Sequence, residues 1–320
     1  MKKIFILLLV FALPVAAQQF GQVGTSGAQF LKINFDPRAS ALGYAAASVV
    51  DNVSAVYTNV AGIESIAQGD VAFAYIPYFA GLKFVSAAGA YRLGDVGVIA
   101  IHGAGFSADE EVTTVEQENG TGEMYTMSNL TFGVAFARRI TDKLAIGVQG
   151  KFIRESYAGH SSSAVAFDIG SAYDLGFAGA KLALTLQNFG PDIEGMSGSY
   201  IDYSDNMLQK DFQKTPLPVT FRASFSAVPY STETYSVRVI GDLVHPNDNT
   251  EHYNIGTEIT LYDFLALRGG VKLNYDDESF ALGIGINGAK FLGQNIRLDY
   301  SFEKFGILSS VQKFSLGFTL

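Results

Sequence analysis

The residue types that most often perform catalysis or bind metals are sparse in this chain of 320 residues. It has four histidines, His102, His160, His245 and His252, and no cysteine. No histidine pair has the spacing of a zinc-binding helix motif, and no Gly-x-Ser-x-Gly nucleophile elbow occurs. The sequence therefore predicts a protein that is not an enzyme and that binds no cofactor and no metal.

One short stretch does combine metal-ligand residue types. Asp248 and Glu251 lie between His245 and His252 in the segment HPNDNTEH, a composition that allows an oxygen-rich cation site. Asn, Asp and Pro are also the residues of ordinary exposed turns. We expect a turn there, and we expect a solvated loop at the acidic run between residues 109 and 118.

Charged residues recur within alternating apolar segments of the last hundred residues. The set comprises Arg238, Asp242, Glu258, Arg268, Lys272, Arg297, Asp299 and Glu303. If these segments are strands, alternation places the apolar residues on one face and the charges on the other. Across neighbouring strands the charges would then form a ladder of mixed sign. Such a ladder serves either as a structural network of ion pairs or as a polar path for a substrate.

The beginning of the chain indicates export. Lys2 and Lys3 precede an apolar run, Ile4 to Leu13, and small residues end at Ala17. This is the pattern of a secretory signal peptide spanning 1–17. The run is too short to cross a bilayer, which requires roughly 20 apolar residues.

Composition favours a membrane protein that crosses with strands. Charged residues are 17% of the chain and aromatic residues 13%, whereas about 25% charged residues is usual in soluble domains. After the signal peptide no apolar stretch reaches the length of a spanning helix. A closed β-barrel satisfies every backbone group between strands and so can cross lipid. The net charge of −9 argues against nucleic-acid binding.

Segments with strand alternation recur through residues 70–320 and predict an all-β fold, a transmembrane antiparallel barrel of about 14 strands. We expect them at 71–79, 82–92, 95–104, 124–138, 144–157, 163–174, 180–189, 217–228, 235–245, 252–261, 264–275, 279–288, 294–304 and 310–320. The long connections 105–123 and 190–216 fall on the side opposite the short turns. This alternation predicts an outer-membrane barrel with a periplasmic C-terminus. A charge facing lipid costs about 2–4 kcal/mol, so the charged faces should point inward.

Residues 18–69 do not follow the strand rhythm and are rich in Gly and Ala. Pro37 stands at a plausible first helical position, so we expect a short helix within 37–50. Inward Ala281, Gly283 and Gly285 would leave room beside it. The segment is therefore predicted to be a small plug inside the barrel.

The N-terminal sequence also resembles that of a known protein family. Residues 24–63, GTSGAQFLKINFDPRASALGYAAASVVDNVSAVYTNVAGI, resemble the start of PorV/PorQ outer-membrane barrels, relatives of the FadL fatty-acid transporters. The matching plug positions include Arg38, Gly43, Asn59 and Ala61. Val60 stands where the family usually has proline. Later segments, such as AFDIGSAYDL and LTLQNFGPDI, extend the resemblance over nearly the whole mature chain.

The resemblance implies a role in type IX protein secretion. Such a barrel would sit in outer-membrane lipid and bind cargo with C-terminal sorting domains, or other secretion subunits, at its outer rim. A candidate partner surface lies in the long connection, which contains Tyr200, Tyr203, Met207, Leu208 and Phe212, residue types common at interfaces. The same loop could instead be a lid. The alternative function is a FadL-like conduit for hydrophobic small molecules, which needs an apolar pocket beneath the plug and a lateral opening.

Overall fold

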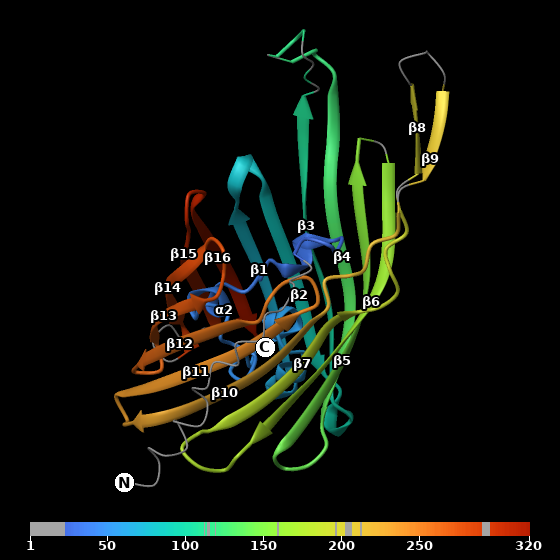
Figure 1. The fold of residues 1–320 in the computed structure, drawn as a ribbon. Helices are drawn as coiled ribbons and strands as arrows, with labels where there is room; N and C mark the ends of the chain where they lie inside the picture. The colour runs from blue at the N-terminus through green and yellow to red at the C-terminus, as the bar shows by residue number, and fades with distance from the viewer. Residues whose placement is uncertain are drawn as a thin grey trace.

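Fourteen antiparallel strands close into a barrel in the computed structural model (Figure 1). The structure describes residues 23–111, 113, 116–118, 120–158, 160–195, 197–201, 207–211, 213–289 and 295–320. The signal-peptide prediction, 1–17, therefore lies outside the described residues. The barrel strands are β1 (Gly69–Pro77), β2 (Lys83–Arg92), β3 (Val98–Glu111), β4 (Met124–Arg139), β5 (Leu144–Tyr157), β6 (His160–Asp174), β7 (Lys181–Phe189), β10 (Thr220–Ser231), β11 (Tyr235–Pro246), β12 (His252–Leu261), β13 (Leu265–Leu273), β14 (Glu278–Asn287), β15 (Ile296–Phe305) and β16 (Ser309–Thr319).

Each strand pairs with its neighbours in chain order, apart from the insertion between β7 and β10. The ring is closed by β1 and β16, which pair in register from Asp70 opposite Thr319 to Tyr75 opposite Phe314. The prediction of a closed fourteen-stranded barrel is confirmed.

Most predicted strand boundaries lie within three residues of the observed ones, and the largest error is at the end of the third strand. Sequence alternation ended the third strand at residue 104, but β3 continues to Glu111, which pairs with Met124 of β4. The extra residues are mostly polar and exposed, so they lack the apolar face by which a membrane strand is recognised in sequence. The β3–β4 hairpin consequently rises above the neighbouring strands (Figure 1).

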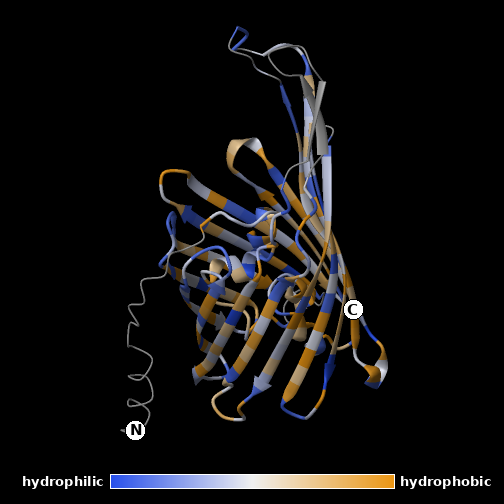
Figure 2. Cartoon of the chain, turned by 45° about the vertical axis from the view of Figure 1, so that its right-hand side comes forward, coloured by the Kyte–Doolittle hydropathy of each residue, from blue (hydrophilic) through white to orange (hydrophobic). Residues whose placement is uncertain are grey.

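Hydrophobic and hydrophilic residues alternate along many barrel strands (Figure 2), and their exposure assigns them to opposite faces of the wall. Large apolar side chains are exposed on the outer surface, among them Phe132, Phe152, Phe225, Leu282 and Phe314. Buried polar and charged side chains face the interior. Within the described residues, no helix is both long enough and apolar enough to cross a membrane.

The described part of the N-terminal segment, residues 23–68, lies inside the barrel (Figure 1). Its short elements are η1 (Gln29–Lys32), α2 (Pro37–Ala41), η2 (Val53–Tyr57) and η3 (Val60–Ser65). Two further turns, η4 (Phe79–Gly81) and η5 (Gly94–Val96), join barrel strands. The segment enters at the end of the barrel that carries the long connections, here called the long-loop end. It leaves into β1 at the opposite, short-turn end. We call it the plug.

The plug contains less helix than the sequence suggested. We expected a helix within 37–50. It begins at Pro37 but ends at Ala41, because Gly43 and Tyr44 both adopt a positive φ of 65°. Such a backbone reverses the chain and cannot continue an α-helix.

Glycines of the wall accommodate the plug backbone. A side chain at Gly270 would overlap the backbone of Leu42 and Gly43, and one at Gly283 would meet Ala41. The expectation that Gly283 leaves room for the plug is confirmed. Gly285 instead makes room for two wall side chains, those of Arg268 and Asp299.

On the other side of the barrel, Gly147 and Gly170 lie against the plug at Asn59 to Ala61. The plug is therefore held between two glycine-lined patches of wall.

The close approach at Gly270 makes a stability prediction. Gly270→Ala should lower the free energy of unfolding by about 1–3 kcal/mol, because its Cβ forces plug and wall apart. Urea unfolding in lipid vesicles measures this. Gly241→Ala is the matched control, since a Cβ there meets nothing within 4 Å. Equal midpoints for the two variants would contradict the docking described here.

Candidate functional site

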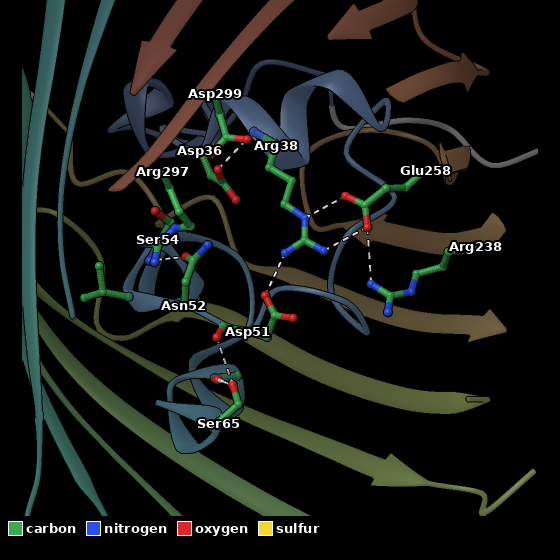
Figure 3. Close-up of polar contacts among 12 residues, drawn as sticks. Asp36, Arg38, Asp51, Asn52, Ser54, Ser65, Arg238, Glu258, Arg297 and Asp299 are labelled. Atoms are coloured by element: carbon green, nitrogen blue, oxygen red, sulfur yellow. Dashed lines mark hydrogen bonds and ion pairs between the residues drawn. The ribbon is translucent and has the colours of Figure 1, made fainter. Parts of the chain in front are cut away.

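A network of charges joins the plug to the wall around Arg38. The side chain of Asp36 caps α2 by accepting from the backbone N–H of Arg38 (3.0 Å). The Arg38 guanidinium donates to both carboxylate oxygens of Glu258 on β12, each at 2.9 Å. Its third nitrogen pairs with Asp51 of the plug at 2.6 Å (Figure 3).

Two wall arginines complete this network. Glu258, whose side chain is 4% exposed, also accepts from Arg268 (2.8 Å) and from Arg238 (3.3 Å). Arg268 further pairs with Asp299 at 2.5 Å. Three guanidinium groups and three carboxylates are thus balanced. We call this set the ionic latch: Arg38, Asp51, Arg238, Glu258, Arg268 and Asp299.

Asp36, beside the latch, is buried and its Oδ2 atom has no hydrogen-bond partner among the described residues. Burial, together with the nearby Asp299 carboxylate, raises the pKa of Asp36 to about 6. Protonation therefore favours the folded state. This contribution is complete below the ordinary pKa of 3.8 and is lost as the pH rises through about 6.

The other predicted ladder residues also contact the plug or its attachment point. The carboxylate of Asp242 accepts from the backbone of Ala46 (3.2 Å) and pairs with Arg222 (3.4 Å). Arg297 pairs with Asp70 at the start of β1 (2.9 Å), and Asp70 accepts from the backbone of Val53 (2.8 Å).

Lys272 pairs with Glu303 at 3.1 Å, and Lys313 pairs with the same carboxylate at 2.7 Å. The Lys313 ammonium also donates to Asn34 O and Tyr44 Oη of the plug. Sequence analysis missed Lys313, although its position next to outward Phe314 marks it as inward-facing. The structure therefore divides the predicted ladder into four separate groups instead of one continuous path.

Of the predicted plug positions, Arg38 and Gly43 lie near β12 and β13, whereas Asn59 and Ala61 lie against β5 and β6. The Asn59 side chain donates to Ala47 O (2.7 Å) and Ser171 O (3.1 Å) and accepts from the backbone of Ala61. It caps η3, which begins at Val60. The two pairs of positions thus serve separate attachments.

An apolar and aromatic cluster fills the barrel interior toward the long-loop end. Ring centroids lie 4.7 Å apart for Phe84 and Phe106, and 6.2 Å apart for Phe84 and Phe35 of the plug. The rings of this aromatic cluster are Phe30, Phe35, Tyr57, Tyr78, Phe79, Phe84, Phe106 and Phe305. Sequence analysis missed it because an inward phenylalanine has the same residue type as a lipid-facing one. One sequence signal could have revealed it: Phe84 lies two residues from Ser86 on the same strand, so the two side chains share a face.

The turn containing His245 and His252 attaches the plug instead of gathering metal ligands. Among the described residues, no group of three or more metal-ligating side chains occurs. Asp248 accepts from Lys32 at 2.6 Å and from Gln29 at 3.0 Å. Burial would raise the pKa of Asp248, but these hydrogen bonds and that from Ser26 outweigh burial and hold it below its usual value.

The predicted partner loop contains a small hairpin, β8 (Ser197–Ile201) and β9 (Met207–Asp211), in which Tyr200 pairs with Leu208. It stands above the barrel at the long-loop end (Figure 1). Tyr203 and Phe212 lie outside the described residues. A partner-binding role for this loop stays a prediction.

Solved structures with a similar fold include channels and transporters. The CymD monoaromatic hydrocarbon channel matches with a TM-score of 0.58 at 12% identity, covering 89% of this chain and 96% of that one. The Ralstonia pickettii toluene transporter TbuX matches with a TM-score of 0.56 at 12% identity, covering 89% of this chain and 97% of the transporter. A Pseudomonas aeruginosa FadL homologue matches with a TM-score of 0.52 at 10% identity, covering 88% of this chain and 97% of the homologue.

No protein-family model matches the sequence, and no curated protein matches it. At these identities the structural matches show the fold, a FadL-like outer-membrane barrel. The neighbours are channels and transporters, not enzymes. They support the conduit hypothesis better than type IX secretion, and none supports the resemblance to PorV/PorQ.

The ionic latch predicts how one plug residue affects stability. Arg38→Met should lower the free energy of unfolding by about 3 kcal/mol, the low end for breaking a buried ion pair, because Arg268 still bonds Glu258. It should also expose the plug to trypsin. Lys214→Met, which removes an exposed pair with Glu194, is the control and should cost less than about 1 kcal/mol. Equal losses would show that the latch does not hold the plug.

Proposed function

We propose that this protein is an outer-membrane conduit for hydrophobic small molecules, of the FadL type. The observation that carries the proposal is the aromatic cluster inside the barrel. Barrel interiors are usually polar, so an interior lined by Phe84, Phe106 and Phe305 at one end is a departure from the rule. An apolar solute that enters between these rings is removed from water, which is favourable.

The cluster does not lie where the conduit hypothesis first placed its pocket. We expected an apolar pocket beneath the plug. The cluster instead lies toward the long-loop end, and Phe30 and Phe35 of the plug form part of it. In an outer-membrane orientation this is the side from which a solute arrives.

Below the cluster the plug fills the lumen. Its residues from Ala39 to Ile66 pack against small wall residues near the short-turn end, including Ala90, Ala100 and Ala137. A solute held at the cluster would therefore need the plug to shift before it could pass through the barrel. The ionic latch is the set of contacts that such a shift would break.

The type IX secretion hypothesis rests on the sequence resemblance. It predicts that deletion of the gene leaves cargo with C-terminal sorting domains in the periplasm. The β8–β9 hairpin would be the contact surface in that case. The aromatic interior has no role in that function, which is why we favour the conduit.

Uptake measurements test the proposal. Expression in a bacterial host lacking its own hydrophobic-compound channel should raise the initial rate of uptake of radiolabelled toluene or oleate severalfold. Phe84→Asp, which places a charge in the aromatic cluster, should return the rate to that of the host, whereas Phe84→Leu should retain most of it. Barrel assembly is checked by heat-modifiable gel mobility. Uptake that is the same with and without the protein would reject the conduit.

A further inference from the structure

Four buried polar side chains on the inner wall have atoms without a hydrogen-bond partner among the described residues. They are both ring nitrogens of His102, Thr131 Oγ1, Gln149 Oε1 and Asn129 Oδ1. Each side chain belongs to a residue that is at most 7% exposed. We call Asn129, Thr131, His102 and Gln149 the unpaired polar cluster.

These four residues occupy adjoining positions of β3, β4 and β5. His102 pairs in register with Gly133, and the ring of His102 occupies the space that a side chain at Gly133 would take. Thr131 and Asn129 follow on the same inward face of β4. Gln149 lies one strand further, on β5. The Gln149 side chain lies within reach of the His102 ring, although no hydrogen bond of standard geometry joins the two.

The cluster is neutral. A nearby cation, Lys151, pairs with Asp168 at 2.8 Å and also bonds Asn188. The Gln149 amide nitrogen donates to the same Asp168 at 2.9 Å. The groups left over are therefore hydroxyl, imidazole and amide, which suit a neutral hydrogen-bonding group rather than an ion.

The unpaired polar cluster adjoins the aromatic cluster. The ring of Tyr57 meets that of His102 edge-on at 5.3 Å and lies 5.4 Å from Phe35. In the sheet, Thr131 stands between Ala104 and Ile153, which both belong to the apolar core of the aromatic cluster. An apolar surface thus ends at groups that lack hydrogen bonds.

A buried polar group that lacks a hydrogen bond destabilises the folded protein. Several such groups side by side destabilise the protein without ligand, and a ligand that hydrogen-bonds them removes this destabilisation. A site built in this way rejects an analogue that lacks the polar group.

From this geometry we propose that the preferred ligand is a neutral aromatic molecule with a single hydroxyl group. Its ring would lie against the aromatic cluster and its hydroxyl would bond the unpaired polar cluster at Thr131 and His102. The inference rests on the proposed conduit function and narrows its substrate class. A carboxylate is disfavoured because the neighbouring Lys151 is already paired.

A matched pair of probes tests the inference. p-Cresol and p-xylene have nearly the same shape and differ by a hydroxyl in place of a methyl group. Equilibrium dialysis against protein in lipid nanodiscs, with empty nanodiscs subtracted, gives the two dissociation constants. An apolar site alone would bind p-xylene more tightly, since burying an unbonded hydroxyl is unfavourable. The inference requires tighter binding of p-cresol.

Variants assign the preference to the cluster. Thr131→Val should weaken p-cresol binding about tenfold, the loss of one hydrogen bond to a buried group, and leave p-xylene binding unchanged. His102→Leu should act in the same direction and serves if the first variant does not assemble. The control is Thr185→Val, which removes another buried, unpartnered hydroxyl on β7, next to Gly170 and away from the aromatic cluster.

The outcomes separate the two proposals. Tighter binding of p-xylene, or p-cresol binding that is unaffected by both cluster variants, overturns the inference while the conduit stands. Binding of neither probe also overturns the inference, and the uptake of toluene or oleate then decides separately whether the conduit stands. The inference is supported if the protein prefers p-cresol, the Thr131→Val and His102→Leu variants lose this preference, and the Thr185→Val variant keeps it.

Discussion

Closure of the ring by β1 and β16 is the constraint on which the rest of the structure depends. A strand that crosses lipid must have every backbone group paired, and pairing of the first strand with the last removes both edges. Closure fixes which side of each strand faces inward. It thereby places the charges of β11 to β16 inside, and it creates an interior too wide to be filled by the inward side chains alone, into which the plug fits.

Two kinds of interaction share that interior. Ion pairs and backbone contacts at glycines hold the plug, with Arg38 and Glu258 at the centre of the latch. Aromatic rings occupy the long-loop end, where Phe35 of the plug meets Phe84 of the wall. The charged contacts attach the plug to the wall, and the aromatic end is the part of the interior where we propose that a hydrophobic solute binds.

The sequence predicted the elements whose signal is local. Alternation with a period of two located all fourteen strands and the inward side of Arg268 and Glu258, because the lipid imposes it residue by residue. The plug was recognisable as a break in that rhythm. Its helix length was not, since the turn at Gly43 is set by contact with Gly270, far along the chain. For the same reason the partner of Arg38, which lies 220 positions away, could not be read from sequence. The inward orientation of Phe84 was not predicted, because phenylalanine occurs both on lipid-facing and on interior surfaces.

A plug that sits inside the barrel and closes it is central to the proposed conduit, and one cross-link tests this directly. The hydroxyls of Ser48 in the plug and Ser224 in β10 are 2.8 Å apart, and the chain has no cysteine. The double variant Ser48→Cys, Ser224→Cys should therefore form a disulfide on mild oxidation and stop uptake of the hydrophobic probe, and a reductant should restore it. Failure of the disulfide to form, or equal uptake in the oxidised and reduced protein, would contradict the account.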